Sequence, residues 1–363
     1  MSVLLVAFAV SLLTTLWAVR SAKWLSHLTG DDDLSGPQKF HEVPVPRIGG
    51  VGIVLGVAAA VPLLWLRSPD HGMAAATLLA CGMPAFLSGL QEDLTKTVSP
   101  RRRLFFTAVS AAMAAWLLGA VIRRTDIPGL DWLVLFGPVA LALTVFVVAG
   151  VANSINIIDG FNGLASMCVV MMFGSLAYVG FQVGDSFLSL LALMGVGAVL
   201  GFFIFNFPAG LVFLGDGGAY FLGFLLAEVA ILLVHRNQEV SPLFPLLLCI
   251  YPVFETLFSI YRRMVLRGAP PGMPDGVHLH SLIYRRFMRW AGGKRAVRSL
   301  TRRNSMTSPY LWMLCMLSVI PSMLWWNNTP VLGGFIIAFG LLYVTLYWRI
   351  VRFRSPRWLA SRR

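Results

Sequence analysis

The apolar stretches Trp132–Gly150 (WLVLFGPVALALTVFVVAG) and Leu164–Val183 (LASMCVVMMFGSLAYVGFQV) flank a short polar segment, Asn153–Gly163 (NSINIIDGFNG). Each apolar stretch is close to the roughly 20 residues that a helix needs to cross a bilayer. An unpaired amide or carboxylate at membrane depth costs several kcal/mol, so chains keep such groups where something binds them. The polar segment therefore predicts a binding site for a charged ligand at the ends of two membrane-spanning helices.

The composition of the whole chain is that of a membrane protein. Its 363 residues are 57% hydrophobic and only 12% charged, with a mean hydropathy of +0.76, whereas about a quarter of the residues in soluble proteins are charged. Backbone in lipid must satisfy its own hydrogen bonds, and the apolar stretches are too long for barrel strands. We therefore expect an all-α integral membrane protein, with residues 1–363 forming one domain.

The hydropathy pattern predicts a polytopic bundle of about eleven transmembrane helices. The expected spans are Ser2–Val19, Ile48–Leu66, Met73–Leu90, Leu104–Ile122, Trp132–Gly150, Leu164–Val183, Phe187–Phe205, Tyr220–Val234, Leu243–Ile260, Tyr310–Trp326 and Val331–Trp348.

The distribution of basic residues predicts the orientation. No basic residue precedes the first span, and Arg20 and Lys23 follow it, so we expect an uncleaved first span with its N-terminus outside. Arginines and lysines also fill the odd-numbered loops, including Arg101–Arg103, and the basic tail 349–363. These residues are interpreted as topology anchors facing anionic headgroups, which places the C-terminus inside. The same interpretation accounts for the net charge of +13 without a nucleic-acid partner.

The polar clusters all fall on the predicted cytoplasmic side. Glu92 and Asp93 follow the third span, Asn153 begins the segment after the fifth, and Asp216 opens the eighth. The pair His278 and His280 lies in the cytoplasmic loop 262–308. The clustering predicts one site at the cytoplasmic membrane surface.

The residue types in these clusters suit a diphosphate held by a metal ion. Asp216 lies in a glycine-rich turn at a predicted helix start, where backbone N–H groups attract anions and the carboxylate offers oxygen to a hard cation. Asn156 and Asp216 together suit Mg²⁺, which takes few protein oxygens and shares its remaining positions with water and phosphate. Lys39, His41 and the two loop histidines would supply positive charge and donors to the remaining phosphate oxygens.

Several residues keep two interpretations. Glu228 and Glu255 lie within apolar spans. For each of them, a structural hydrogen bond and a functional role are equally compatible with the sequence. The His278–His280 pair could also be a metal site, although no third ligand is close in sequence. The cysteines Cys81, Cys168, Cys249 and Cys315 lie in apolar spans without metal-binding spacing, which indicates small buried hydrophobic residues.

The order of these motifs resembles that of the polyprenyl-phosphate N-acetylhexosamine-1-phosphate transferases, glycosyltransferase family 4. The resemblance covers a core from residue 39 to residue 286. The matching segments are Gln38–Gly50 (QKFHEVPVPRIGG), Gly89–Asp93 (GLQED), Asn153–Leu164 (NSINIIDGFNGL), Phe213–Gly218 (FLGDGG) and His278–Ser281 (HLHS). Three positions depart from the family pattern: Glu92 and Asn162 stand where Asp is usual, and Ser281 replaces a third histidine.

The resemblance implies a division of roles among these residues. Asn156 and Asp216 would hold Mg²⁺, with Mn²⁺ as the alternative ion, and Asp216 would be catalytic together with Glu92 and Asp93, which would face the lipid phosphate. The remaining residues would bind substrate. Those in the nucleotide and phosphate pocket are Lys39, Asn153, Asp159 and Asn162, joined by His41, and those at the diphosphate or sugar are His278 and His280.

The resulting functional hypothesis is a phosphotransferase. It transfers an (N-acetyl)hexosamine 1-phosphate from a UDP-sugar to a polyprenyl phosphate such as undecaprenyl phosphate, releases UMP, and starts a lipid-linked cell-envelope glycan of the O-antigen or exopolysaccharide type. Its expected place is the bacterial inner membrane, with the site on the cytoplasmic face and a second copy of the chain as a candidate partner. Two alternatives stay open: a membrane transporter or lipid flippase, and a catalytically inactive scaffold of the same fold.

Overall fold

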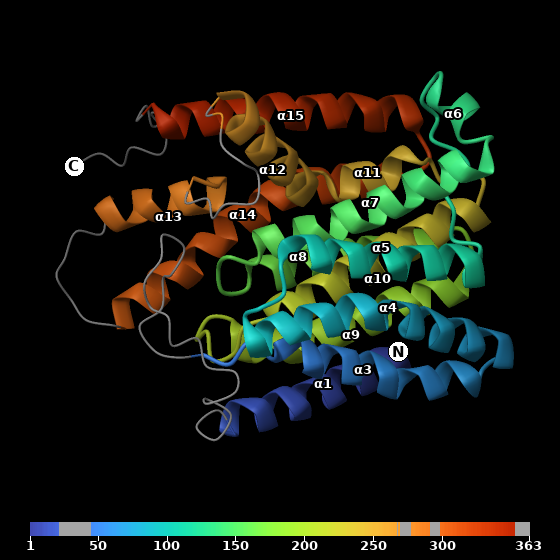
Figure 1. Cartoon of the computed structure of the whole chain (residues 1–363), viewed down its shortest axis with the longest axis horizontal. Helices are drawn as coiled ribbons and strands as arrows, with labels where there is room; N and C mark the ends of the chain where they lie inside the picture. Colours follow the sequence, from blue (N-terminus) through green and yellow to red (C-terminus); the bar gives the residue numbers. More distant parts are fainter. Residues whose placement is uncertain (22–44, 267, 269–276, 291–297, 353–363) are drawn as a thin grey trace.

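A computed structural model describes residues 1–21, 45–266, 268, 277–290 and 298–352 of the chain. In this part of the chain every regular element is helical, which confirms the expected all-α class. The helices run approximately along one common direction, with α6 at one end of the bundle and α13 at the other (Figure 1). Their bounds are α1 Ser2–Arg20, α3 Gly49–Trp65, α4 Pro69–Thr95, α5 Pro100–Leu118, α6 Leu130–Leu133, α7 Gly137–Ile158, α8 Leu164–Gln182, α9 Ser186–Asn206, α10 Gly215–Arg236, α11 Leu243–Leu248, α12 Ile250–Tyr261, a π-helical turn Arg262–Leu266, α13 Leu279–Trp290, α14 Arg298–Leu324 and α15 Thr329–Val351.

Eight helices of the described chain are long and apolar enough to cross a membrane, namely α1, α4, α7, α8, α9, α10, α14 and α15. The other three expected spans are not among these eight helices. Helix α3 is apolar but has only 17 residues, α5 is not among the eight, and the stretch expected at Leu243–Ile260 is divided between α11 and α12. The multi-pass bundle is therefore established, whereas the number eleven stays a prediction.

Helix α10 is the centre of the bundle. In its most apolar stretch 94% of the residues are buried, and it packs against α3, α4, α5, α7, α8 and α9. Its N-terminal end is approached closely by two neighbouring helices. A Cβ at Gly50 would lie 2.4 Å from the Gly218 nitrogen, and a Cβ at Gly89 would lie 2.5 Å from the Gly217 nitrogen. Only glycine permits this backbone approach, which brings α3 and α4 against the first turn of α10.

The last part of the polar segment, Asp159–Gly163, forms a tight turn between α7 and α8 at the same end of the bundle, whereas Asn153 and Asn156 lie within α7. Gly163 has φ +75°, a conformation that L side chains rarely adopt. Its N–H donates to Asn206 Oδ1 at 2.7 Å, and Asn206 Nδ2 donates to the Val212 carbonyl at 2.8 Å. One buried amide thus joins the α7–α8 turn to the loop between α9 and α10.

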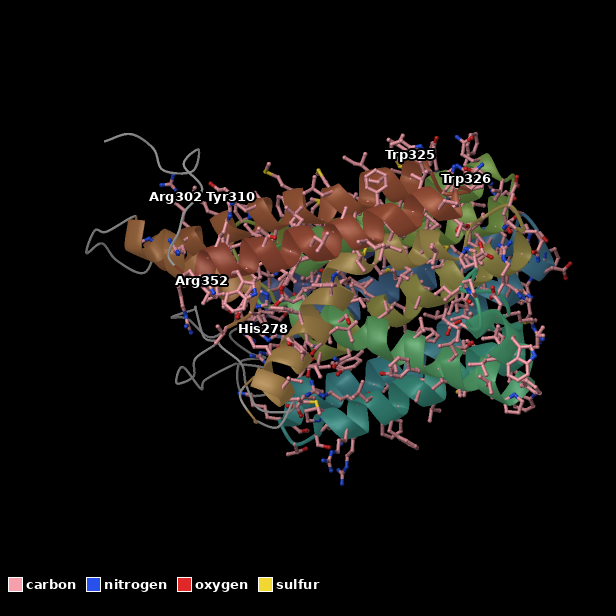
Figure 2. The ribbon with its side chains drawn as sticks, turned by 90° about the horizontal axis from the view of Figure 1, so that it is seen from above. His278, Arg302, Tyr310, Trp325, Trp326 and Arg352 are labelled. Atoms are coloured by element: carbon pink, nitrogen blue, oxygen red, sulfur yellow. The ribbon has the colours of Figure 1, made fainter. Side chains whose placement is uncertain are left out.

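The two ends of the bundle differ in side-chain character. Trp325 and Trp326, at the end of α14, lie at the end opposite His278, Arg302 and Arg352 (Figure 2). Tryptophan is enriched where a helix meets a membrane–water interface, and arginine is enriched on the cytoplasmic side. The arrangement agrees with the expectation that the polar motifs gather at one end.

Candidate active site

Asp216, at the start of α10, is contacted by side chains from two other helices. Asn156 Nδ2, in the last turn of α7, donates to Asp216 Oδ1 at 2.8 Å. Arg103, in the first turn of α5, forms an ion pair with Asp216 Oδ2. The expected convergence of Asn156 and Asp216 is therefore present, although the two residues are 60 positions apart in sequence.

Asp93, near the end of α4, is bonded to the backbone of α10. Its carboxylate is buried and accepts the N–H groups of Asp216 and Gly217, both at 2.9 Å. Gly215 precedes this turn with φ +76°, and a Cβ there would lie 2.6 Å from Asp93 Oδ2. A carboxylate at a helix N-terminus satisfies free N–H groups and is attracted by the helix dipole. Asp93 therefore holds Asp216 in position.

Glu92 points away from its neighbour, as adjacent residues on a helix must. Its Oε2 atom accepts the Val98 N–H at 2.6 Å, in the connection between α4 and α5. The structure thus gives the two acidic residues separate contacts, one on α10 and one on the segment that leads to Arg103.

Arg103 is a site residue that the sequence analysis missed. Arg101 and Arg102 are exposed, as topology anchors should be, but only 12% of the Arg103 side-chain surface is exposed. Its guanidinium lies 5.7 Å from the centre of the Tyr220 ring, and the Tyr220 hydroxyl donates to Asn153 Oδ1 at 3.2 Å. The sequence did contain a signal that Arg103 faces inward. It lies on the same face of the helix as Thr107 and Ser110, which are buried.

Asp159 ends α7 and adds a further carboxyl group to the site. Burial raises the pKa of Asp159 to about 8, while the positive charge of Arg47 acts in the opposite direction. Arg47 lies just before α3. Asp159 and Asp93 are close enough to act on each other electrostatically, which places the Asp159 carboxyl group beside the residue that holds the first turn of α10.

The loop histidines pack against the same turn. A Cβ at Gly160 would lie 3.1 Å from His280 Nε2, and the His280 ring meets the Phe161 ring edge-on with centroids 5.4 Å apart. His278 stacks on His280 at 5.1 Å, and its Nδ1 is 2.9 Å from Glu255 Oε1. The start of α13 is therefore docked on the turn that follows α7.

Comparison with known proteins identifies relatives of the chain. Residues 75–234 match the family described as Glycosyl transferase family 4. The probable undecaprenyl-phosphate N-acetylglucosaminyl 1-phosphate transferase of Bacillus subtilis (strain 168) is 30% identical over 281 residues, which are 76% of each chain. The chain belongs to glycosyl transferase family 4. This confirms the resemblance inferred from the motifs.

Two further family 4 relatives show the range of names in the group. An undecaprenyl-phosphate alpha-N-acetylglucosaminyl 1-phosphate transferase of Thermotoga maritima is 30% identical over 258 residues, covering 71% of this chain and 74% of that protein. A phospho-N-acetylmuramoyl-pentapeptide-transferase of Geobacillus kaustophilus is 32% identical over 199 residues, covering 52% of this chain and 60% of that protein. The matched family segment runs from α4 to α10 and contains Asp93, Arg103, Asn156 and Asp216.

Asn162, one of the departures from the usual family 4 pattern, faces α14. Its backbone N–H donates to Asn304 Oδ1 at 2.8 Å, and its Nδ2 donates to Ser305 Oγ at 3.1 Å. The Ser308 hydroxyl donates to its carbonyl oxygen at 2.6 Å. Asn162 is 2% exposed, so its described contacts join the α7–α8 turn to α14.

The remaining predicted residues and one described cavity stand apart from this cluster. Lys39 and His41 lie outside the described residues. A cavity of about 490 Å³ lies at the opposite end of the bundle and is lined by the start of α4, the α8–α9 turn and the end of α10, including His71 and His235. It contains none of the predicted site residues. Within the described chain, no group of three or more His, Cys, Asp or Glu side chains is arranged to hold a metal ion.

Proposed function

We propose that this family 4 protein transfers an N-acetylhexosamine 1-phosphate from a UDP-sugar to a polyprenyl phosphate and releases UMP. The observation that carries the proposal is the convergence of Asn156, Arg103 and Asp216 at one end of the bundle. Curated relatives named as undecaprenyl-phosphate N-acetylglucosaminyl 1-phosphate transferases support the donor and acceptor classes.

The reaction brings two anions together. A phosphate oxygen of the acceptor lipid attacks the β-phosphorus of the UDP-sugar, the bond from that phosphorus to the bridging oxygen breaks, and UMP leaves with the bond electrons. A phosphate monoester has its second pKa near 6, so the attacking oxygen needs little deprotonation at neutral pH. Positioning and charge neutralisation are then the main contributions that the protein makes.

The side chains of the site fit those two tasks. Arg103 supplies a fixed guanidinium beside Asp216, where a phosphate oxygen would gain a charge-assisted hydrogen bond. Asp93 holds the first turn of α10 in place through two backbone bonds. In the proposed division of roles, Glu92 and Asp93 lie toward the lipid phosphate. The nucleotide and phosphate pocket is assigned to Lys39, His41, Asn153, Asp159 and Asn162, and the diphosphate or sugar to His278 and His280.

The proposed cofactor is Mg²⁺, with Mn²⁺ as the alternative ion. Asn156 and Asp216 are adjacent oxygen-bearing side chains on two helices, which fits an ion that uses one or two protein ligands and completes its coordination with water and phosphate. These two residues would hold it, and when bound it would neutralise diphosphate charge. Arg103 and the ion would then share the Asp216 carboxylate.

The proposed orientation has eleven membrane crossings, the N-terminus outside and the C-terminus inside. Arg103 at the start of α5 and Arg349 and Arg352 at the end of α15 support a cytoplasmic position for the site under the positive-inside rule. The protein would lie in a bacterial inner membrane and start a lipid-linked glycan of the O-antigen or exopolysaccharide type, as a monomer or a homodimer.

A direct assay tests the proposal. The purified chain in detergent is incubated with radiolabelled UDP-N-acetylhexosamine, with and without undecaprenyl phosphate and with and without Mg²⁺. We expect labelled lipid and UMP only when donor, acceptor and Mg²⁺ are all present. UMP release with donor alone would indicate a covalent phosphoenzyme route. An absence of labelled lipid with every UDP-sugar offered would leave the transporter and scaffold alternatives.

A further inference from the structure

Glu255, on α12, is buried, and both of its carboxylate oxygens form hydrogen bonds. Its Oε1 atom lies 2.9 Å from His278 Nδ1 and accepts the Leu279 N–H at 3.2 Å. Its Oε2 atom accepts the hydroxyl proton of Tyr343, on α15, at 2.6 Å. Only 2% of the residue is exposed. One carboxylate therefore joins α12 and α15 to the residue that begins α13.

The contact with Glu255 determines which nitrogen of His278 is available. A carboxylate accepts hydrogen bonds, so His278 Nδ1 carries the proton and Nε2 faces away from Glu255. The stacked ring of His280 is 5.1 Å away, and His280 in turn packs on Gly160 and Phe161, directly after Asp159. The contacts thus run without a break from Glu255 to the turn that carries Asp159.

We propose that Glu255 is a positioning residue that orients His278 for the transferred diphosphate. Held by Glu255 through Nδ1, the His278 ring has Nε2 left to face the diphosphate, and in the doubly protonated ring Nε2 donates to a phosphate oxygen. This inference rests on the proposed transferase function and assigns to that reaction a residue on α12, which lies outside the segment that matches the family.

The remaining charged and titratable groups near the ring come from three elements. His280 stacks on it from α13, and Tyr343 reaches the same carboxylate from α15. Arg262, at the end of α12, donates to the carbonyl of Val277, the residue before His278, at 2.6 Å. The Tyr347 hydroxyl donates to the same carbonyl at 3.2 Å. Among the described residues, Glu255 is hydrogen-bonded to the His278 ring, and Asp159 lies beyond His280 in the α7–α8 turn.

The substitution Glu255→Gln separates charge from shape. The glutamine oxygen can accept the same two N–H groups and its amide can donate to the Tyr343 oxygen, so the number of hydrogen bonds is kept while the negative charge is removed.

Glu228→Gln is the matched control. Glu228 is 0% exposed, and neither of its carboxyl oxygens has a hydrogen-bond partner in the described structure. It lies twelve residues after Asp216 on α10, which is about 18 Å along a helix.

In the transferase assay, Glu255→Gln should lower kcat by about tenfold to a hundredfold while KM for the UDP-sugar changes less. Glu228→Gln should retain the activity of the unmodified protein. In the double variant Glu255→Gln/His278→Ala, the loss should equal that of His278→Ala alone, because Glu255 acts through His278. A Glu255→Gln variant as active as Glu228→Gln, or losses that multiply in the double variant, would overturn the proposal.

A spectroscopic measurement separates this proposal from the transferase function itself. The chain contains six histidines, and ¹⁵N-histidine NMR of the detergent-solubilised protein can assign His278 by its loss in His278→Ala. We expect the His278 Nδ1 proton to resonate at higher field in Glu255→Gln than in Glu228→Gln, because an amide oxygen is a weaker acceptor than a carboxylate. An unchanged Nδ1 proton signal would overturn the positioning role even if the protein is an active transferase. A shifted Nδ1 proton signal in a protein that transfers no sugar phosphate would instead retain the Glu255–His278 hydrogen bond and remove the proposed reaction.

Discussion

Asp93 accepts the backbone N–H of Asp216 at 2.9 Å, so these two aspartates have different roles in the site. Asp93 is buried and bonded to the first turn of α10, whereas the Asp216 side chain is 20% exposed and contacts Asn156 and Arg103. The first residue fixes the position of the second. Substitutions at the two positions should consequently fail in different ways.

Asp216→Asn should abolish turnover and its dependence on Mg²⁺ while leaving the protein folded. The amide cannot supply the anionic oxygen that a hard cation and Arg103 both require. The assay is product formation across a Mg²⁺ titration, with the elution volume in detergent as the check on folding. Asp70→Asn is the control, because Asp70 is an exposed carboxylate in the first turn of α4. Near-normal turnover of Asp216→Asn would remove the metal assignment.

Asp93→Ala should reduce stability as well as activity. It leaves two N–H groups at the start of α10 without their acceptor, and the loss of a helix cap costs about 0.5–2 kcal/mol. We expect a fall of several degrees in the thermal unfolding temperature measured in detergent, and a smaller fall in Asp216→Asn. Equal unfolding temperatures for Asp93→Ala and the unmodified protein would show that the two backbone bonds contribute nothing to stability.

Arg103→Ala should lower kcat by about a hundredfold or more, because it removes a fixed positive charge from the proposed phosphate site. The neighbouring Arg102 is exposed and is a direct control, so Arg102→Ala should retain most of the activity. Measuring kcat and KM for both variants distinguishes the two arginines. If both variants lost the same activity, the basic segment would act as a unit and the individual assignment of Arg103 would be wrong.

The raised pKa of Asp159 predicts a pH-dependent penalty on stability. Its pKa is about 8 in the folded protein, against about 3.9 in an unfolded chain. Between these values the folded state holds the extra proton, so the free energy of unfolding falls as pH rises toward 8 and levels off above it. Asp159→Asn removes this group. Its unfolding temperature relative to the unmodified protein should therefore rise between pH 5 and pH 8. A difference that stayed constant across this range would contradict the assigned pKa.

Much of the architecture follows from composition alone. Polar backbone in lipid must pair within its own segment, so long apolar stretches such as Leu164–Val183 had to be helices, and this one became α8. The cost of burying amides and carboxylates in lipid is also why the sequence alone predicts that Asn156 and Asp216 lie together. The interruption near Cys249 that divides α11 from α12 was not foreseen, because hydropathy averages over a window and does not detect a local break.

The partners of individual charges depend on packing between helices. Arg101, Arg102 and Arg103 are identical residues in sequence, yet only Arg103 turns inward to Asp216, because the rotation of α5 against α10 selects one face. Glu228 and Glu255 are both buried glutamates in apolar surroundings, and only the second meets a histidine and a tyrosine. Hydrophobicity is a property of each single residue, so the order of residues in the sequence is enough to predict which segments enter the membrane. A hydrogen bond or an ion pair belongs to two residues, here 23 to 113 positions apart, and exists only when the segments that carry them have been brought together.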